Sequence, residues 1–277
     1  MSPHPSPTRS GRRRSARLGA ALAALGLLVS GCDARELYED SLSWGLPEPA
    51  TEQAENIYDL YLGSNAAAVV VGAFVLALIF FAVFRYRKRS DDLPRQVRYN
   101  LPIEVLYTAV PFVIIAVLFY YTVLSQNYVN ELSNDEAGES QADVNIGVVG
   151  FQWNWQFNYV DEDVQVTGET NRPAQLVLPT DRTIRFVQTS PDVIHSFWVP
   201  DFLFKRDVIP GRANQFELTL KKEGEFIGRC AELCGEKHAF MNFSVLVVSP
   251  EEYDTYIDGL QDDPNAAILT SPAGSPE

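Results

Sequence analysis

The chain has 277 residues and is acidic, with 36 Asp and Glu against 22 Lys and Arg and a formal net charge of −14. This balance excludes nucleic acid as a partner, because binding to a polyanion depends on Lys and Arg. The sequence contains no Cys-x-x-Cys-His motif, which excludes a covalently attached haem of the c type. Cysteine, histidine and methionine are scarce, so a cluster of these residues is informative.

Residues 1–31 are predicted to be a signal peptide of the lipoprotein type. They contain five arginines and no acid, and the apolar stretch at residues 18–29 is too short to span a bilayer. The sequence Val29-Ser30-Gly31-Cys32 resembles the lipobox of bacterial lipoproteins, so Cys32 is expected to carry a lipid anchor. The alternative is an ordinary signal peptide with an incidental cysteine. Removing the segment would change the net charge from −14 to −19.

A membrane helix hairpin is predicted at residues 65–126, after an outer segment at 32–64. The apolar runs 65–84 and 105–124 are each long enough to cross a bilayer. The connecting loop, 85–103, is rich in Lys and Arg, and positive charge favours the cytoplasmic side. Both flanking segments then lie outside the cytoplasm. A buried helix pair would instead need a large surrounding helical protein, which this chain does not supply.

Residues 127–260 are predicted to form an exported all-β domain, a sandwich or barrel. Short apolar or alternating segments separated by turn signals indicate strands, at residues 144–151, 175–178, 183–186, 215–220, 225–228 and 242–248. A helix is predicted at 251–259, with Ser249 as its N-cap and Pro250 in its first turn. The tail 261–277 is polar and is predicted to be disordered.

Five soft or imidazole donors indicate a metal site in this domain: His195, Cys230, Cys234, His238 and Met241. Thiolate and thioether sulfur stabilise Cu(I), and imidazole suits both copper oxidation states. Mononuclear zinc is an alternative that leaves the methionine unexplained. A disulfide between the two cysteines is a second alternative that leaves both histidines unexplained. The set favours two copper ions bridged by two thiolates.

The spacing of these residues resembles subunit II of the haem–copper cytochrome c oxidases. The family pattern, His, 34 residues, Cys-x-Glu-x-Cys-x3-His-x2-Met, is met from His195 to Met241. The resemblance implies a cupredoxin fold holding the dinuclear copper A centre. It further implies that Cys230 and Cys234 bridge the two coppers and that His195 and His238 are terminal ligands. Met241 is then a weak ligand, and the backbone carbonyl of Glu232 is a further ligand.

The same resemblance gives Glu232 a second role. Its side chain is expected to reach a magnesium ion at the interface with subunit I, and a hard carboxylate suits magnesium. The alternative is a solvated loop acid.

An aromatic stretch, Gly-Phe-Gln-Trp-Asn-Trp-Gln-Phe-Asn-Tyr at residues 150–159, also resembles the family. The resemblance makes Trp153 the point at which electrons enter. Two tryptophans at this spacing otherwise indicate packing on a sheet face, and the resemblance adds little for Trp155. Phe151 and Asn154 differ from the histidine and tyrosine that the family often has.

Glu104 stands at the start of the second apolar run. The resemblance implies that it marks the mouth of a proton pathway into subunit I, and an acid at a membrane edge can admit protons. The alternative is a helix N-terminal glutamate favoured by the helix dipole.

Acids outnumber bases in the exported part, with 25 Asp and Glu against 10 Lys and Arg from residue 127 onward. Acidic patches steer basic partners, and the resemblance implies a cytochrome c-type donor. The predicted docking acids are Asp161, Glu162, Asp163, Asp192 and Asp201. A generally acidic surface is the alternative.

Taken together, these observations predict the electron-transfer subunit of a proton-pumping terminal oxidase of the aa3 type in a bacterial cell membrane. Expected partners are subunit I, which holds the haem and reduces oxygen, other oxidase subunits, membrane lipid, and a cytochrome bc complex in a supercomplex. A quinol-oxidising relative would lack the copper ligands, and a copper-delivery lipoprotein would not need the hairpin. A copper A subunit of a nitric oxide reductase stays open.

Overall fold

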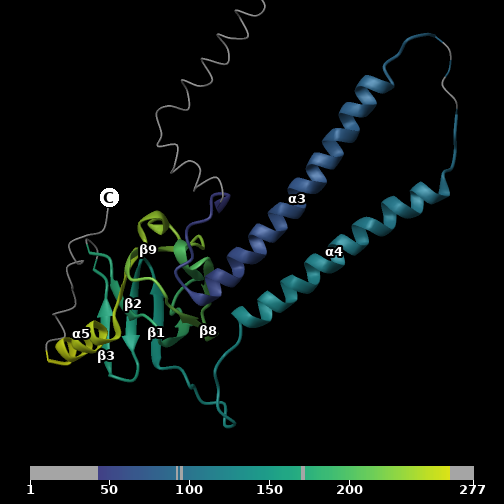
Figure 1. Ribbon diagram of the computed structural model, residues 1–277. Coiled ribbons are helices and arrows are strands. Elements are labelled where there is room, and N and C mark those ends of the chain that lie inside the picture. Colours follow the sequence, from purple (N-terminus) through teal and green to yellow (C-terminus); the bar gives the residue numbers. More distant parts are fainter. Residues whose placement is uncertain (1–42, 92, 94–95, 170–171, 263–277) are drawn as a thin grey trace, which may run out of the picture. The chain divides into compact units, whose positions relative to one another are not determined.

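The computed structural model describes residues 43–91, 93, 96–169 and 172–262 (Figure 1). The predicted signal peptide and Cys32 lie outside the described residues. The chain divides into two compact units, residues 1–46 and 47–277. In the first, residues 43–46 are described, and Leu46 N donates a hydrogen bond to Ser43 O at 3.2 Å.

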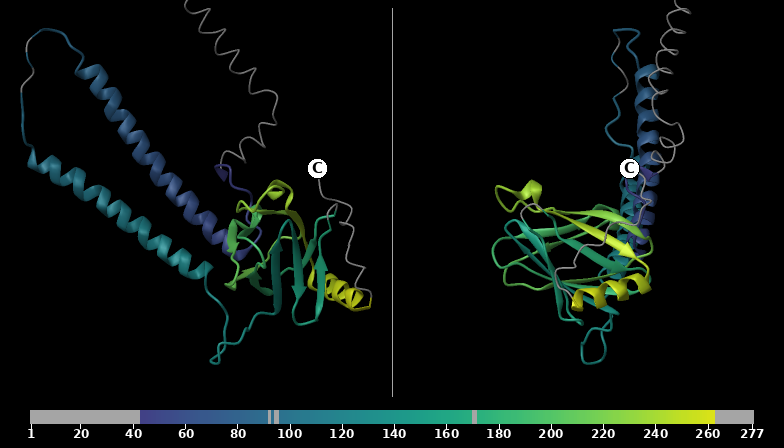
Figure 2. Two further views of the ribbon diagram at one scale, coloured as in Figure 1. Left: turned by 180° about the vertical axis from the view of Figure 1, so that it is seen from behind. Right: turned by 90° about the vertical axis from the view of Figure 1, so that its left-hand side faces the viewer.

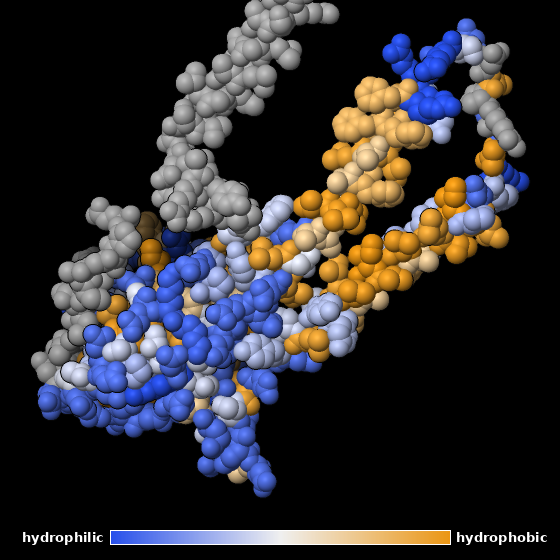
Figure 3. Space-filling model, viewed as in Figure 1, coloured by the Kyte–Doolittle hydropathy of each residue, from blue (hydrophilic) through white to orange (hydrophobic). Residues whose placement is uncertain are grey.

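Two long helices, α3 (Glu52–Arg85) and α4 (Leu101–Val129), are apolar enough to cross a membrane. Apolar side chains cover both helices, and hydrophilic ones gather where their connection begins (Figure 3). Helix α3 begins well before the apolar run because the side chain of Thr51 caps it, accepting from Ala54 N at 2.9 Å. Pro111 lies inside α4. Membrane helices tolerate proline because neighbouring helices and local adjustments satisfy the backbone groups that it frees.

The rest of the second unit is a β-sandwich of two five-stranded sheets, in two layers (Figure 2). The strand orders are β3-β2-β1-β5-β8 and β4-β10-β9-β6-β7. The β1–β5 and β10–β4 pairs are parallel, and the other strand pairs are antiparallel. The strands are β1 (Val144–Phe151), β2 (Asn154–Tyr159), β3 (Val164–Thr167), β4 (Gln175–Pro179), β5 (Thr183–Thr189), β6 (His195–Val199), β7 (Phe204–Val208), β8 (Asn214–Thr219), β9 (Gly224–Cys230) and β10 (Asn242–Val248).

The predicted fold class, a membrane hairpin followed by a β-sandwich, is confirmed. Strands β2, β3, β6 and β7 were not predicted as separate strands. Strand β2 does alternate, with Trp155, Phe157 and Tyr159 buried, but Asn and Gln between these aromatics weaken the β signal. Strands β3 and β7 are short, and charged residues occupy β7.

Helix α5 (Pro250–Asp262) begins as predicted from Ser249. Glu252 N donates to Ser249 Oγ and Ser249 N donates to Glu252 Oε2, each at 3.3 Å. This reciprocal pair is a capping box. Gln261 and Asp262, predicted to begin the tail, lie in this helix, and the rest of the predicted tail lies outside the described residues.

An aromatic core fills the space between the sheets beneath the loop that joins β9 to β10. Phe243 stacks on Phe197 with ring centroids 4.9 Å apart, and Trp155 meets Phe243 edge-on at 5.2 Å. All three side chains are buried. Gly228 on β9 provides the room, because a Cβ there would lie 2.1 Å from the Phe243 ring.

We therefore expect Gly228→Ala to destabilise the domain by about 1–3 kcal/mol, the usual result of overpacking a core. Gly259→Ala is the matched control. It adds the same methyl group to helix α5 with nothing within 4 Å, and should stabilise by roughly 0.5–1 kcal/mol. Thermal denaturation of the two variants checks the contrast. Equal midpoints would contradict this account of the core.

Candidate metal centre

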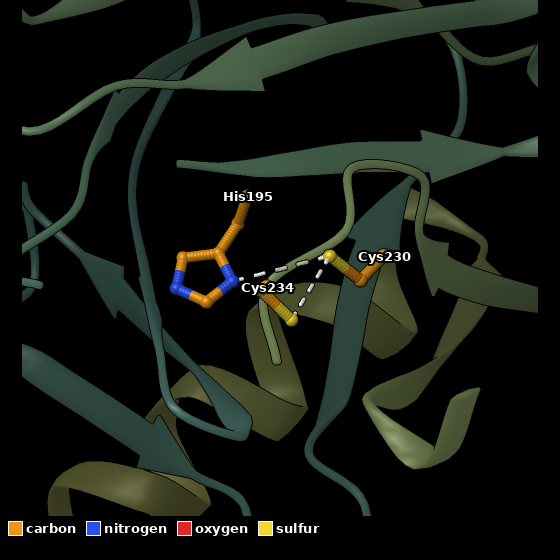
Figure 4. Close-up of side chains that lie close together, drawn as sticks. All are labelled: His195, Cys230 and Cys234. Carbon is orange, nitrogen blue, oxygen red and sulfur yellow. Dashed lines mark hydrogen bonds between the residues drawn. The ribbon is translucent and has the colours of Figure 1, made fainter. Parts of the chain in front are cut away.

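Three separate elements bring the predicted ligands together. His195 is the first residue of β6, and Cys230 is the last residue of β9. Cys234, His238 and Met241 follow in the loop before β10, where residues 238–240 form a short 3-10 helix. This loop is closed at its base, because Cys230 N donates to Met241 O at 3.1 Å. Figure 4 shows His195, Cys230 and Cys234 converging.

The donor atoms form a compact cluster with Cys234 at its centre. Cys234 Sγ lies 3.9 Å from Cys230 Sγ, 3.6 Å from His238 Nδ1 and 3.7 Å from Met241 Sδ. Cys230 Sγ lies 3.9 Å from His195 Nδ1 and 3.2 Å from the carbonyl oxygen of Glu232. His195 is fully buried, both cysteines and Met241 are buried, and His238 is half-buried.

This donor set fits a metal. The sulfur–sulfur distance of 3.9 Å is far above a disulfide bond of about 2.0 Å, and both thiols are free. It is also less than twice the usual metal–thiolate bond length of about 2.3 Å, so one ion can contact both sulfurs. Ligand atoms of His195, Cys230 and Cys234 all lie within 4.8 Å of one another. The disulfide alternative therefore does not describe this structure.

The two thiols cannot both ionise easily without a cation. Burial raises the pKa of each thiol. Hydrogen bonds with His195 and with the backbone of Glu232 and Ser196 outweigh burial at Cys230 and lower its pKa. The charge on Cys230 then adds to burial and raises the pKa of Cys234. A positive ion between the two sulfurs would relieve this repulsion, so the electrostatics favour a bound metal.

The turn before β2 lies against the loop formed by residues 231–241, called the metal loop below. Trp153 Nε1 donates to Cys234 O at 3.1 Å, and Gln152 Nε2 donates to the same oxygen at 2.8 Å. The Trp153 indole is half-buried, with Lys237 Nζ 5.8 Å from its ring centroid. Trp155, by contrast, is fully buried and packs edge-on against His195 at 6.3 Å. The two tryptophans therefore have different surroundings, one at the loop and one in the core.

Asp192 is the predicted docking acid that lies at the site. Its Oδ1 is 2.9 Å from His195 Nε2, and its Oδ2 accepts from Gln152 N at 2.7 Å. Burial would raise its pKa, but these hydrogen bonds outweigh burial and the pKa is lowered. Burial alone would lower the pKa of His195. The contacts with Cys230 and Asp192 outweigh burial, so the pKa of His195 is raised.

The structure places the other predicted docking acids elsewhere. Asp161, Glu162 and Asp163 follow β2, whereas Trp153 precedes it. Strand β2 has 6 residues, so at about 3.3 Å per residue the two ends lie roughly 20 Å apart. Asp161 accepts from Asn145 N at 3.1 Å. Burial raises the pKa of Glu162. Asp201 is half-buried, and its carbonyl oxygen accepts from Ala50 N at 3.1 Å.

Two further predicted acids have simple local settings. Glu232 is exposed on the metal loop. Glu104 lies in the first turn of α4, where its Oε1 accepts from Asn100 N at 2.9 Å. A carboxylate at a helix N-terminus is favoured by the dipole, so this contact supports the helix-capping alternative for Glu104.

Two residues of the site were missed by sequence reasoning. Gln152 holds the carbonyl of Cys234, and its only sequence signal is its place in the aromatic stretch. Gly150 allows close packing, because a Cβ there would lie 3.3 Å from the His195 side chain and 3.2 Å from Trp155. A glycine in a strand can mark such a close approach.

Comparison with known proteins agrees with this geometry. Residues 144–248 match the family "Cytochrome C oxidase subunit II, periplasmic domain", and residues 40–123 match its transmembrane domain. A probable cytochrome c oxidase subunit 2 of Streptomyces coelicolor is 41% identical over 94% of this chain and 92% of its own length. The chain belongs to the cytochrome c oxidase subunit II family.

Other relatives are also similar. Cytochrome c oxidase subunit 2 of Mycobacterium bovis is 34% identical over 88% of this chain and 81% of its own length. A solved structure, the periplasmic domain of subunit II of cytochrome oxidase of Bradyrhizobium japonicum, is 33% identical. It covers 44% of this chain and 96% of its own length, with a TM-score of 0.41.

Membership of this family makes the chain subunit II of a haem–copper terminal oxidase, and therefore part of an enzyme complex with subunit I. It is a membrane protein with two spanning helices and a periplasmic domain. The family also implies binding of copper A, and the histidine and cysteine donors needed for it are present.

Proposed function

We propose that this subunit II accepts electrons from a cytochrome c-type donor and passes them to haem in subunit I of an aa3-type, proton-pumping oxidase. The observation that carries the proposal is the convergence of two free, buried thiols with His195, His238 and Met241. Cys230, Cys234, His195, His238 and Met241 would hold two copper ions, which would supply a site able to accept and release one electron at a time.

The chain's own residues keep the site rigid and dry. His195 is packed between Trp155 and the metal loop, and the stacked pair Phe197 and Phe243 packs edge-on against Trp155. Both cysteine side chains are buried, so water has little access to their sulfur atoms. A prearranged and water-free donor set is what fast electron transfer needs, because few groups must move when the charge changes.

The remaining roles belong to the same proposal. Residues 127–260 form the copper A domain, 65–126 the hairpin with a cytoplasmic loop at 85–103, and Cys32 carries a lipid anchor after removal of 1–31. Glu232 reaches magnesium at the interface with subunit I, which its exposure on the loop would allow. At the membrane edge, Glu104 is proposed to admit protons once its contact with Asn100 N opens, and a cytochrome bc complex is the proposed supercomplex partner.

Electrons are proposed to enter at Trp153. Its hydrogen bond to Cys234 O joins the indole directly to the backbone of a bridging ligand. We expect Trp153→Phe to slow the reduction of copper A by reduced cytochrome c by at least an order of magnitude, with unchanged copper content. Rapid mixing of the purified oxidase with the donor measures this rate.

Trp198→Phe is the matched control for that experiment. Trp198 is also half-buried, but it lies on β6 beside Lys205. Reduced cytochrome c should reduce copper A in this variant at the wild-type rate. Equal rates in the Trp153 and Trp198 variants would remove Trp153 from the path. A wild-type complex whose haem is reduced by cytochrome c without prior reduction of a copper centre would contradict the proposed function.

A further inference from the structure

We infer that Asp192 is a positioning residue that ties the copper ligand His195 to the turn carrying Trp153. The inference rests on the proposed copper A function and assigns Asp192 a role other than donor docking. Its carboxylate reaches both sides of the site at once, with one oxygen on the His195 ring and the other on the backbone of Gln152.

The contacts of Asp192 form a connected set within one short turn. Oδ1 accepts from Val193 N at 2.6 Å and from Ser190 Oγ at 3.1 Å, besides its contact with His195. Oδ2 accepts from Gln152 N at 2.7 Å. The side chain is 29% exposed, although the residue as a whole lies at the surface. These bonds hold the carboxylate in one orientation.

An ionised carboxylate can only accept hydrogen bonds, so His195 must carry its proton on Nε2 to make this contact. The other ring nitrogen, Nδ1, then presents a lone pair toward Cys230 Sγ, 3.9 Å away. Metal-binding histidines commonly donate their second ring N–H to a carboxylate, which fixes the tautomer and ring orientation. Asp192 thus prepares His195 to bind through Nδ1.

The same carboxylate also fixes the turn. Gln152 N is held by Asp192, and the Gln152 side chain donates to Cys234 O. Trp153, the next residue, donates to that same carbonyl. A chain of hydrogen bonds therefore runs from the ring of one ligand, through Asp192 and Gln152, to the backbone of another ligand.

Asp192→Asn is the sharpest test, because the amide has the same shape but only one accepting oxygen and no charge. One of the two sides, His195 or Gln152, then faces an N–H donor. In the complete oxidase we expect copper to be lost to a chelator at about 10- to 100-fold lower concentration, the usual effect of removing such a partner. The reduction potential of copper A should rise, because a nearby negative charge no longer favours the oxidised form.

Asp201→Asn is the control. It removes another acid predicted for docking, but one whose backbone rather than its carboxylate makes the observed hydrogen bond. Copper retention and the potential should match those of the wild type. Asp192→Glu keeps the charge on a longer side chain. The reduction potential of copper A in this variant should lie between those of the wild type and Asp192→Asn.

Different failures have different signatures. A wild-type complex without the spectrum of an electron shared by two coppers would overturn the proposed function and this inference with it. A normal wild type, with an Asp192→Asn variant unchanged in potential and copper retention but with a raised KM for cytochrome c, would overturn the inference alone. If Asp192→Asn does not assemble, Asp192→Glu decides the matter. A copper A reduction potential and copper spectrum equal to those of the wild type in Asp192→Glu would overturn the positioning role of Asp192.

Discussion

Replacement of Cys234 with serine is expected to abolish the copper A centre and with it turnover on reduced cytochrome c. Cys234 Sγ lies within 3.9 Å of three other donor atoms, Cys230 Sγ, His238 Nδ1 and Met241 Sδ. A serine hydroxyl is a hard donor that stays protonated near neutral pH, so it cannot replace a soft bridging thiolate. Two copper ions per complex should be lost.

Metal analysis of the purified oxidase, together with steady-state turnover, checks this result. Cys32→Ser is a matched control, since it makes the same atomic change at the third cysteine of the chain, which lies outside the predicted ligand set. That variant should lose the proposed lipid anchor but keep its copper and its turnover, because the two membrane helices still hold the chain in the bilayer. A Cys234→Ser oxidase with wild-type copper content would contradict the bridging role.

Replacement of Arg185 with methionine is expected to destabilise the periplasmic domain by about 3–5 kcal/mol, because it leaves a buried charge without its partner. Arg185 on β5 and Glu217 on β8 are directly opposite in the sheet, and both are buried. Arg185 Nε donates to Glu217 Oε1 at 2.8 Å, and a second guanidinium nitrogen contacts the same carboxylate.

This ion pair also holds the segment that connects α4 to the sandwich. Ser133 N donates to Glu217 at 3.0 Å, and Arg185 Nη2 donates to Ser133 O at 2.6 Å. The temperature at which the oxidase loses its copper A signal should therefore fall in Arg185→Met. Removing both charges, in Arg185→Met with Glu217→Met, should recover much of that loss. The loss of stability in the double variant should be smaller than the sum of the losses in the two single variants. A loss equal to that sum or larger would contradict a paired role.

The sequence is sufficient to predict that the proposed copper ligands cluster, because four of them lie within twelve consecutive residues, and the structure does bring their donor atoms together. It also predicts the hairpin, since a bilayer selects length and apolarity directly. Contacts that depend on strand register are different. The opposition of Arg185 and Glu217 follows from the pairing of β5 with β8, and nothing in either strand alone indicates it.

Asp192 shows the same limit at the site itself. Counted as one acid among many, it resembles Asp161 and Asp163, and only the turn between β5 and β6 brings its carboxylate to His195. Asp161 and Asp163 lie close to the aromatic stretch in sequence, yet strand β2 separates them from Trp153. Nearness along the chain is a poor guide where an extended strand intervenes.

A dinuclear copper centre held by Cys230 and Cys234 should be detected by electron paramagnetic resonance of the purified oxidase. The wild type should give a signal whose hyperfine structure arises from one electron shared equally between two copper nuclei, and Cys234→Ser should lack that signal. A signal from an electron localised on a single copper nucleus, or the same spectrum in both proteins, would contradict this dinuclear centre.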